Sequence, residues 1–284
     1  MGAWTSSSGH WPADWTKPGD RMQTHFPGES AEYRAARGRL RRSTPAILLI
    51  AVAAVCWAVT ARRMQGMDMG PGTDLGGIGW FGVVWATMMA AMMLPSLVPM
   101  ALTCAGASRN AGGSSPTAAS CVFACGYLLT WVGAGVLAYA LIQGVTSLDL
   151  SWFAWDEGGP YVAGGVILGA ALYELSPAKS TCLRHCRNPE LLRRRWRPGR
   201  SRALLMGLEH GGFCVGSSWA LMAVLFALGV MNVPWMIVVA ALVAIEKLLP
   251  WDGVAIGATV VFIAALGLAV ALAPDQVPGL TIPA

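Results

Sequence analysis

Long apolar runs separated by short polar links dominate the chain. Runs of about twenty residues, the length at which a helix crosses a roughly 30 Å hydrocarbon core, recur along it. Seven such runs predict seven spanning helices: Thr44–Thr60, Trp80–Thr103, Ala119–Ile142, Gly159–Ser176, Leu204–Val230, Val233–Leu249 and Val254–Leu272. Because a barrel strand needs only about ten residues, these runs favour an all-α transmembrane bundle.

The composition supports this class of protein. Hydrophobic residues make up 55% of the 284 positions and charged residues only 12%, and the mean hydropathy is +0.53. A soluble domain is about one-quarter charged. The composition therefore excludes a soluble globular enzyme and predicts a multi-pass protein of the plasma (inner) membrane.

Three regions follow from the pattern. Residues 1–43 mix serine, proline, glycine and charges, and are expected to form a disordered cytoplasmic tail. Residues 44–273 form the predicted transmembrane domain, and residues 274–284 a short outer tail. Arg37, Arg39, Arg41 and Arg42 come directly before the first apolar run, so it is interpreted as an uncleaved span rather than a signal peptide.

Loop charges predict the orientation, because Lys and Arg in short loops resist translocation. Residues 177–202 carry nine basic residues against the single acid Glu190, whereas residues 143–158 carry three acids and no base. An N-in, C-out arrangement fits every loop except residues 61–79, an outer loop that holds Arg62 and Arg63. The net charge of +5 is thus a topology signal, and no nucleic-acid partner is expected.

Unusual polar residues fall toward the cytoplasmic half of this arrangement: Glu174, His210, Cys214 and Glu246. An ionisable group in hydrocarbon costs about 2.5–3.5 kcal/mol, so such groups need a partner, a water-filled cavity or a metal. The alternative is an interfacial role. In that case Glu246 and Lys247 extend to the headgroups, and Glu174 pairs with Lys179 or an arginine of the basic loop.

Cysteine and histidine occur at ligand spacing in two places. Cys182, His185 and Cys186 offer soft ligands suited to Cu(I) or zinc, although no second CxxC accompanies them. His210 and Cys214 are four residues apart and share a helix face. The alternatives are reduced cytosolic thiols in the first case and close helix packing beside glycines in the second.

Three further cysteines lie near the same predicted layer. Cys121 and Cys125 are four residues apart in the third span, and Cys104 follows the second span. They are ordinary buried small residues unless they point inward, in which case they would add thiols to the layer.

Methionine is the other anomaly, with fourteen in all. Met64, Met67 and Met69 lie in the outer loop, where thioethers would select Cu(I) and survive oxidation. Met88, Met92 and Met93 in the second span fill a helix interface or form steps of a copper pathway. No Walker loop, GxGxxG fingerprint or HExxH motif is present, so ATP-driven pumping and nucleotide-linked chemistry have no support.

Several ordered motifs resemble one family. They are Trp85-Ala-Thr-Met-Met-Ala-Ala-Met-Met-Leu-Pro-Ser96, Tyr173-Glu-Leu-Ser-Pro-Ala-Lys179, Cys182-Leu-Arg-His-Cys-Arg-Asn-Pro189, Cys214-Val-Gly-Ser-Ser-Trp-Ala-Leu-Met222, Met231-Asn-Val-Pro-Trp235 and Glu246-Lys-Leu-Leu-Pro250. Residues 80–250 therefore resemble the bacterial predicted metal-binding integral membrane proteins, a domain of unknown function. The resemblance implies a helical inner-membrane protein with a metal. This chain departs from the pattern at Ser217 and Ser218, where the family has cysteines.

The leading hypothesis is a membrane-embedded copper-binding protein for copper uptake, transfer or insertion, with zinc as the other candidate metal. Its inner site would be built from Cys182, Cys186, His185, His210, Cys214, Glu174 and Glu246, and its outer site from Met64, Met67 and Met69. A metallochaperone or membrane enzyme subunits would be its protein partners.

Two alternatives stay open. One is a membrane oxidoreductase or an accessory subunit of a membrane metalloenzyme, with Glu174 or Glu246 as proton donor. The other is a structural membrane subunit without a metal. No catalytic residue is assigned.

Overall fold

The computed structural model describes residues 31–64, 76–112, 115–147, 158–197, 199–229, 232–248 and 252–277. Its regular elements there are the helices α1 (Ala31–Met64), α2 (Ile78–Asn110), α3 (Pro116–Thr146), α4 (Gly159–Glu174), α5 (Pro177–Arg187), α6 (Pro189–Arg195), α7 (Arg200–Leu228), α8 (Val233–Leu248) and α9 (Asp252–Leu272), and the 3₁₀ turn η2 (Pro274–Gln276). The all-α prediction is confirmed for these residues.

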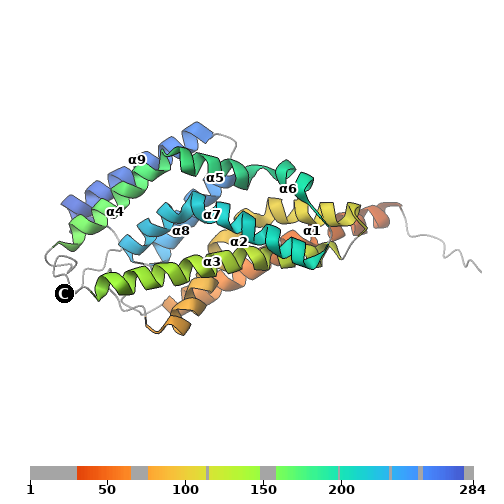
Figure 1. Cartoon of the computed structure of the whole chain (residues 1–284), viewed down its shortest axis with the longest axis horizontal. Coiled ribbons are helices and arrows are strands. Elements are labelled where there is room, and N and C mark those ends of the chain that lie inside the picture. Colours follow the sequence, from red (N-terminus) through yellow and green to blue (C-terminus); the bar gives the residue numbers. More distant parts are fainter. Residues whose placement is uncertain are drawn as a thin grey trace, which may run out of the picture. The chain divides into compact units, whose positions relative to one another are not determined.

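The chain divides into two compact units, residues 1–41 and residues 42–284. The second unit contains every feature discussed below. Within it α3 packs along α7, α4 packs along α9, and α2 packs on α3 (Figure 1). The core of this unit is apolar and includes several fully buried methionines of α2.

Five stretches are long and apolar enough to cross a membrane: Ser43–Met64, Ile78–Asn110, Pro116–Val145, Arg200–Leu228 and Gly253–Leu272. They correspond to five of the seven predicted spans. A sixth results if α4 and α5, bent by 64° at their junction, are one broken span. The remaining predicted span is α8, whose 16 residues extend about 24 Å, less than a hydrocarbon core.

The backbones of α3 and α7 approach each other closely. A Cβ atom on Gly207 would lie 2.1 Å from the carbonyl oxygen of Phe123, so only glycine fits there. One turn later, Gly211 lies against Thr130, whose hydroxyl donates to the Leu208 carbonyl oxygen. Small residues at such positions let two helix backbones meet. This contact holds α7, and with it Cys214, against α3.

The outward faces of the helices are apolar. Leu172 exposes 72% of its surface, Val254 70% and Leu272 78%. Large apolar side chains in such numbers are unusual on a protein surface in water and are what a hydrocarbon solvent requires.

Candidate functional site

The break between α4 and α5 begins the site. Pro177 cannot donate a backbone hydrogen bond, so α4 ends before it and α5 begins with it. The Ser176 side chain caps the new helix by accepting a hydrogen bond from the Lys179 backbone N–H at 3.2 Å. The chain turns by 64° there. As a result Glu174, at the end of α4, and Lys179, in the first turn of α5, can face each other.

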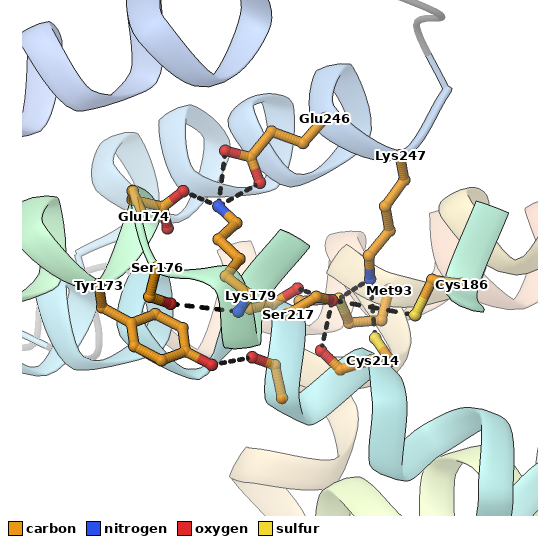
Figure 2. A network of polar contacts seen from close by, with 12 residues as sticks. Met93, Tyr173, Glu174, Ser176, Lys179, Cys186, Cys214, Ser217, Glu246 and Lys247 are labelled. Atoms are coloured by element: carbon orange, nitrogen blue, oxygen red, sulfur yellow. Dashed lines mark hydrogen bonds and ion pairs between the residues drawn. The ribbon is translucent and has the colours of Figure 1, made fainter. Parts of the chain in front are cut away.

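Lys179 forms a buried ion cluster with two carboxylates, Glu174 and Glu246. Its Nζ atom donates to Glu246 Oε1 at 2.9 Å and Oε2 at 2.8 Å and contacts the Glu174 carboxylate (Figure 2). All three side chains are at most 2% exposed. The expectation that these acids have partners is confirmed, and so is the Glu174–Lys179 pair. The alternative in which Glu246 reaches the headgroups is wrong, because Lys179 draws it inward.

One face of α5 holds both the lysine of the ion cluster and a buried cysteine. The buried residues of this helix are Lys179, Leu183 and Cys186, spaced by four and three residues, which places them on one side. Lys179 fixes this face against α8 through Glu246. Cys186, two turns further on, consequently points toward α7, where its Sγ lies 3.9 Å from Ser217 Oγ.

Three sulfur-bearing side chains from three helices lie near Lys247 and Ser217 (Figure 2). They are Met93 of α2, Cys186 of α5 and Cys214 of α7, called here the sulfur cluster. Lys247 of α8 reaches into it. Its Nζ lies 2.7 Å from Cys214 Sγ and 4.0 Å from Met93 Sδ. Cys186 is close enough to interact electrostatically with both Cys214 and Lys247.

Besides Lys247 of α8, Cys214 has a polar neighbour on α3. The Tyr127 hydroxyl lies 2.9 Å from Cys214 Sγ, and both residues are fully buried. The thiol of Cys214 therefore lies between a hydroxyl and an ammonium group. Both groups can donate a hydrogen bond to the sulfur atom.

A cavity of about 90 Å³ opens beside the sulfur cluster. Its polar lining includes Tyr127, Cys186, His210 and Lys247. The volume is large enough for several water molecules. Cys186 is the residue of the sulfur cluster that borders this cavity, together with Lys247.

The other predicted inner ligands lie where α7 packs on α5 and on α3. Cys182 is half-buried with its sulfur against Gly216 of α7. His185 stacks on Phe213 at 4.2 Å between ring centroids. His210 packs its ring on Phe123 and Tyr127 of α3.

Across the part of the chain that the structure describes, no three or more His, Cys, Asp and Glu side chains are grouped to hold a metal ion. The sulfur cluster contains two residues of these four types, Cys186 and Cys214, and the Met93 thioether beside them.

The remaining sulfur residues divide clearly. Cys121 and Cys125 are exposed, so the hypothesis that they add inward thiols is wrong, whereas Cys104 is buried. Met88 and Met92 are buried in the core, as expected for packing. Met64 is partly buried, while Met67 and Met69 lie outside the described residues.

The sequence did not predict that Lys247 and Tyr127 lie beside Cys214. The interfacial alternative treated Glu246 and Lys247 alike, as two side chains that would both extend to the headgroups. Neighbouring residues on a helix, however, point about 100° apart. Glu246 turns to Lys179 and Lys247 turns to Cys214. The sequence did contain a sign of this arrangement. A lysine directly after a buried acid is itself at membrane depth, and a charge there needs a partner of its own.

A family model matches residues 82–270, about two thirds of the chain, and its description is copper chaperone, PpoB2. The chain belongs to this copper chaperone family. Neither the curated proteins nor the solved structures include a match to it. The match covers α2 through most of α9, so all the residues of the sulfur cluster and the ion cluster lie within it.

Proposed function

We propose that this protein is embedded in the membrane and binds Cu(I) as cargo at the sulfur cluster, for transfer to another copper protein. The observation that carries the proposal is the convergence of Met93, Cys186 and Cys214 from three helices beside a cavity. Two thiolates and a thioether are soft ligands, and Cu(I) is the common biological ion that prefers them. The copper chaperone family supports the same cargo.

The carboxylates have a different role in this proposal from the one that the sequence suggested. Lys179 occupies both oxygens of Glu246 and contacts Glu174, so these acids position α5 and α8 rather than bind copper. His210 and Cys182 border the sulfur cluster and are available as exchange ligands on the way in or out.

The membrane embedding rests on the five long apolar stretches and the exposed apolar faces. In the N-in, C-out arrangement, which counts α8 and the broken α4–α5 pair as spans, the sulfur cluster would face the cytoplasmic half and Met64, Met67 and Met69 would form an outer collecting site. A soluble metallochaperone or a copper-requiring membrane enzyme is then the exchange partner.

The first prediction concerns the metal itself. The protein purified in detergent under reducing conditions and offered Cu(I) should bind about one copper ion per chain at the sulfur cluster. The Cys186→Ser/Cys214→Ser variant should lose this copper, because a hydroxyl is a poor ligand for Cu(I). Bound metal is measured by mass spectrometry after gel filtration.

The matched control is Cys121→Ser/Cys125→Ser. These two thiols lie four residues apart on α3, are exposed and lie outside the sulfur cluster, so the variant also replaces two cysteines by serine. Copper content should be unchanged in this variant. Equal copper in the wild type and in the Cys186→Ser/Cys214→Ser variant would contradict the assignment.

A further inference from the structure

Lys247 places a positive charge inside a site built for a cation. Its ammonium nitrogen is 2.7 Å from Cys214 Sγ and 4.0 Å from Met93 Sδ. An ammonium group has three donors and no lone pair, so it cannot act as a ligand itself. It can only donate N–H···S hydrogen bonds and contribute its charge.

The helix that carries Lys247 is fixed in orientation. Its neighbour Glu246 accepts two hydrogen bonds from Lys179 and is 2% exposed. Rotation of α8 that withdrew Lys247 from Cys214 would break this buried pair. The backbone of Lys247 thus stays beside the sulfur cluster when a metal enters, and the ammonium group stays within reach of it.

The surrounding charges cancel without Lys247. The carboxylates of Glu174 and Glu246 face the cations Lys179 and Arg187, the latter interacting with Glu246. These two negative and two positive groups sum to zero. The net charge of the sulfur cluster is therefore decided by its thiolates, by Lys247 and by the metal ion.

The balance differs between monovalent and divalent ions. Metal-bound cysteines are thiolates, so Cys186 and Cys214 contribute two negative charges and Lys247 contributes one positive charge. A bound Cu(I) brings the sum to zero. A bound Zn(II) leaves one uncompensated positive charge, which is costly in a buried, low-dielectric environment.

We propose that Lys247 is the residue that makes the sulfur cluster select a monovalent over a divalent ion. This inference rests on the proposed function, since it assigns the selectivity of that same site. The thiolates alone would not discriminate in this way, because both Zn(II) and Cu(I) bind cysteine strongly.

The test compares Lys247→Leu, which removes the charge without adding a ligand, with Lys247→Arg, which keeps the charge. Affinities for Cu(I) and for Zn(II) are measured separately in detergent without oxygen, by competition with chromophoric chelators. Ag(I) serves as a monovalent probe that does not change oxidation state. Lys247→Gln is the second neutral variant, in case the leucine variant does not fold.

The ratio of the Zn(II) to the Cu(I) dissociation constant should fall by roughly tenfold or more in the neutral variants, a change of about 1.4 kcal/mol. In Lys247→Arg the ratio should stay close to the wild-type value. Ag(I) should follow Cu(I). An unchanged ratio in both neutral variants would overturn the role of Lys247.

Failure of the selectivity proposal differs from failure of the proposed function. Wild-type protein that binds Cu(I) through Cys186 and Cys214, with a ratio insensitive to Lys247, refutes only the selectivity proposal. Wild-type protein that binds no Cu(I) refutes the proposed function and the selectivity proposal with it.

Discussion

Ser217 is the residue best placed to change the sulfur cluster by a single atom. Its hydroxyl donates to the Cys214 carbonyl oxygen at 2.9 Å and lies 3.9 Å from Cys186 Sγ. The side chain is fully buried. A sulfur atom at this position would therefore join the two cysteines that are already present.

Ser217→Cys should tighten Cu(I) binding by roughly tenfold, because a third thiol replaces a hydroxyl that binds Cu(I) poorly. X-ray absorption should show an additional sulfur neighbour around copper. The matched control is Ser218→Cys, which adds a thiol one position further round the helix and should have a smaller effect. Equal tightening by both variants would contradict the geometry given for Ser217.

The α4–α5 break is the element on which the ion cluster depends. A continuous helix would place Glu174 and Lys179 five residues and about 7.5 Å apart along one axis. The 64° bend brings both into contact and leaves room for Glu246 of α8. Three helices are thus tied together by one lysine.

Lys179→Leu should destabilise the protein by about 3–5 kcal/mol, since it leaves two buried carboxylates without their ammonium partner. Thermal unfolding in detergent should show a lower midpoint than for the wild type. The triple variant Glu174→Gln/Lys179→Leu/Glu246→Gln removes all three charges and should recover part of the loss. An unfolding midpoint unaffected by Lys179→Leu would show that the cluster does not stabilise the fold.

The sequence predicted the helices better than it predicted which of their side chains contact one another. Apolar run length identified the helices, and Pro177 marked the end of the fourth run. The predicted orientation of the spans placed Glu174, Cys214 and Glu246 at a similar depth in the membrane. It did not give the rotation of each helix, and rotation decides that Cys186 faces inward while Cys121 and Cys125 face outward. Rotation follows from long-range packing, such as the Gly207 contact with Phe123, which no local pattern contains.

For the whole molecule, the orientation stays a prediction from the loop charges. A reporter enzyme that works only outside the cytoplasm should be active when it is inserted in residues 143–158. A reporter that works only inside the cytoplasm should be active when it is inserted near Gly199. Alkaline phosphatase and green fluorescent protein fusions measure the two cases. The reverse pattern at both insertion points would place the sulfur cluster toward the outer face instead.

The sulfur cluster also has a consequence for biogenesis. Met93 and Lys247 are 154 residues apart in the chain, and Cys186 and Cys214 lie between them on separate helices. During synthesis both thiols and the thioether leave the ribosome before the lysine that lies among them. The complete pocket exists only after α8 has been inserted against α5 and α7. Under the proposed function, the charge that selects a monovalent ion is therefore the last part of the site to be added, once α8 is in place.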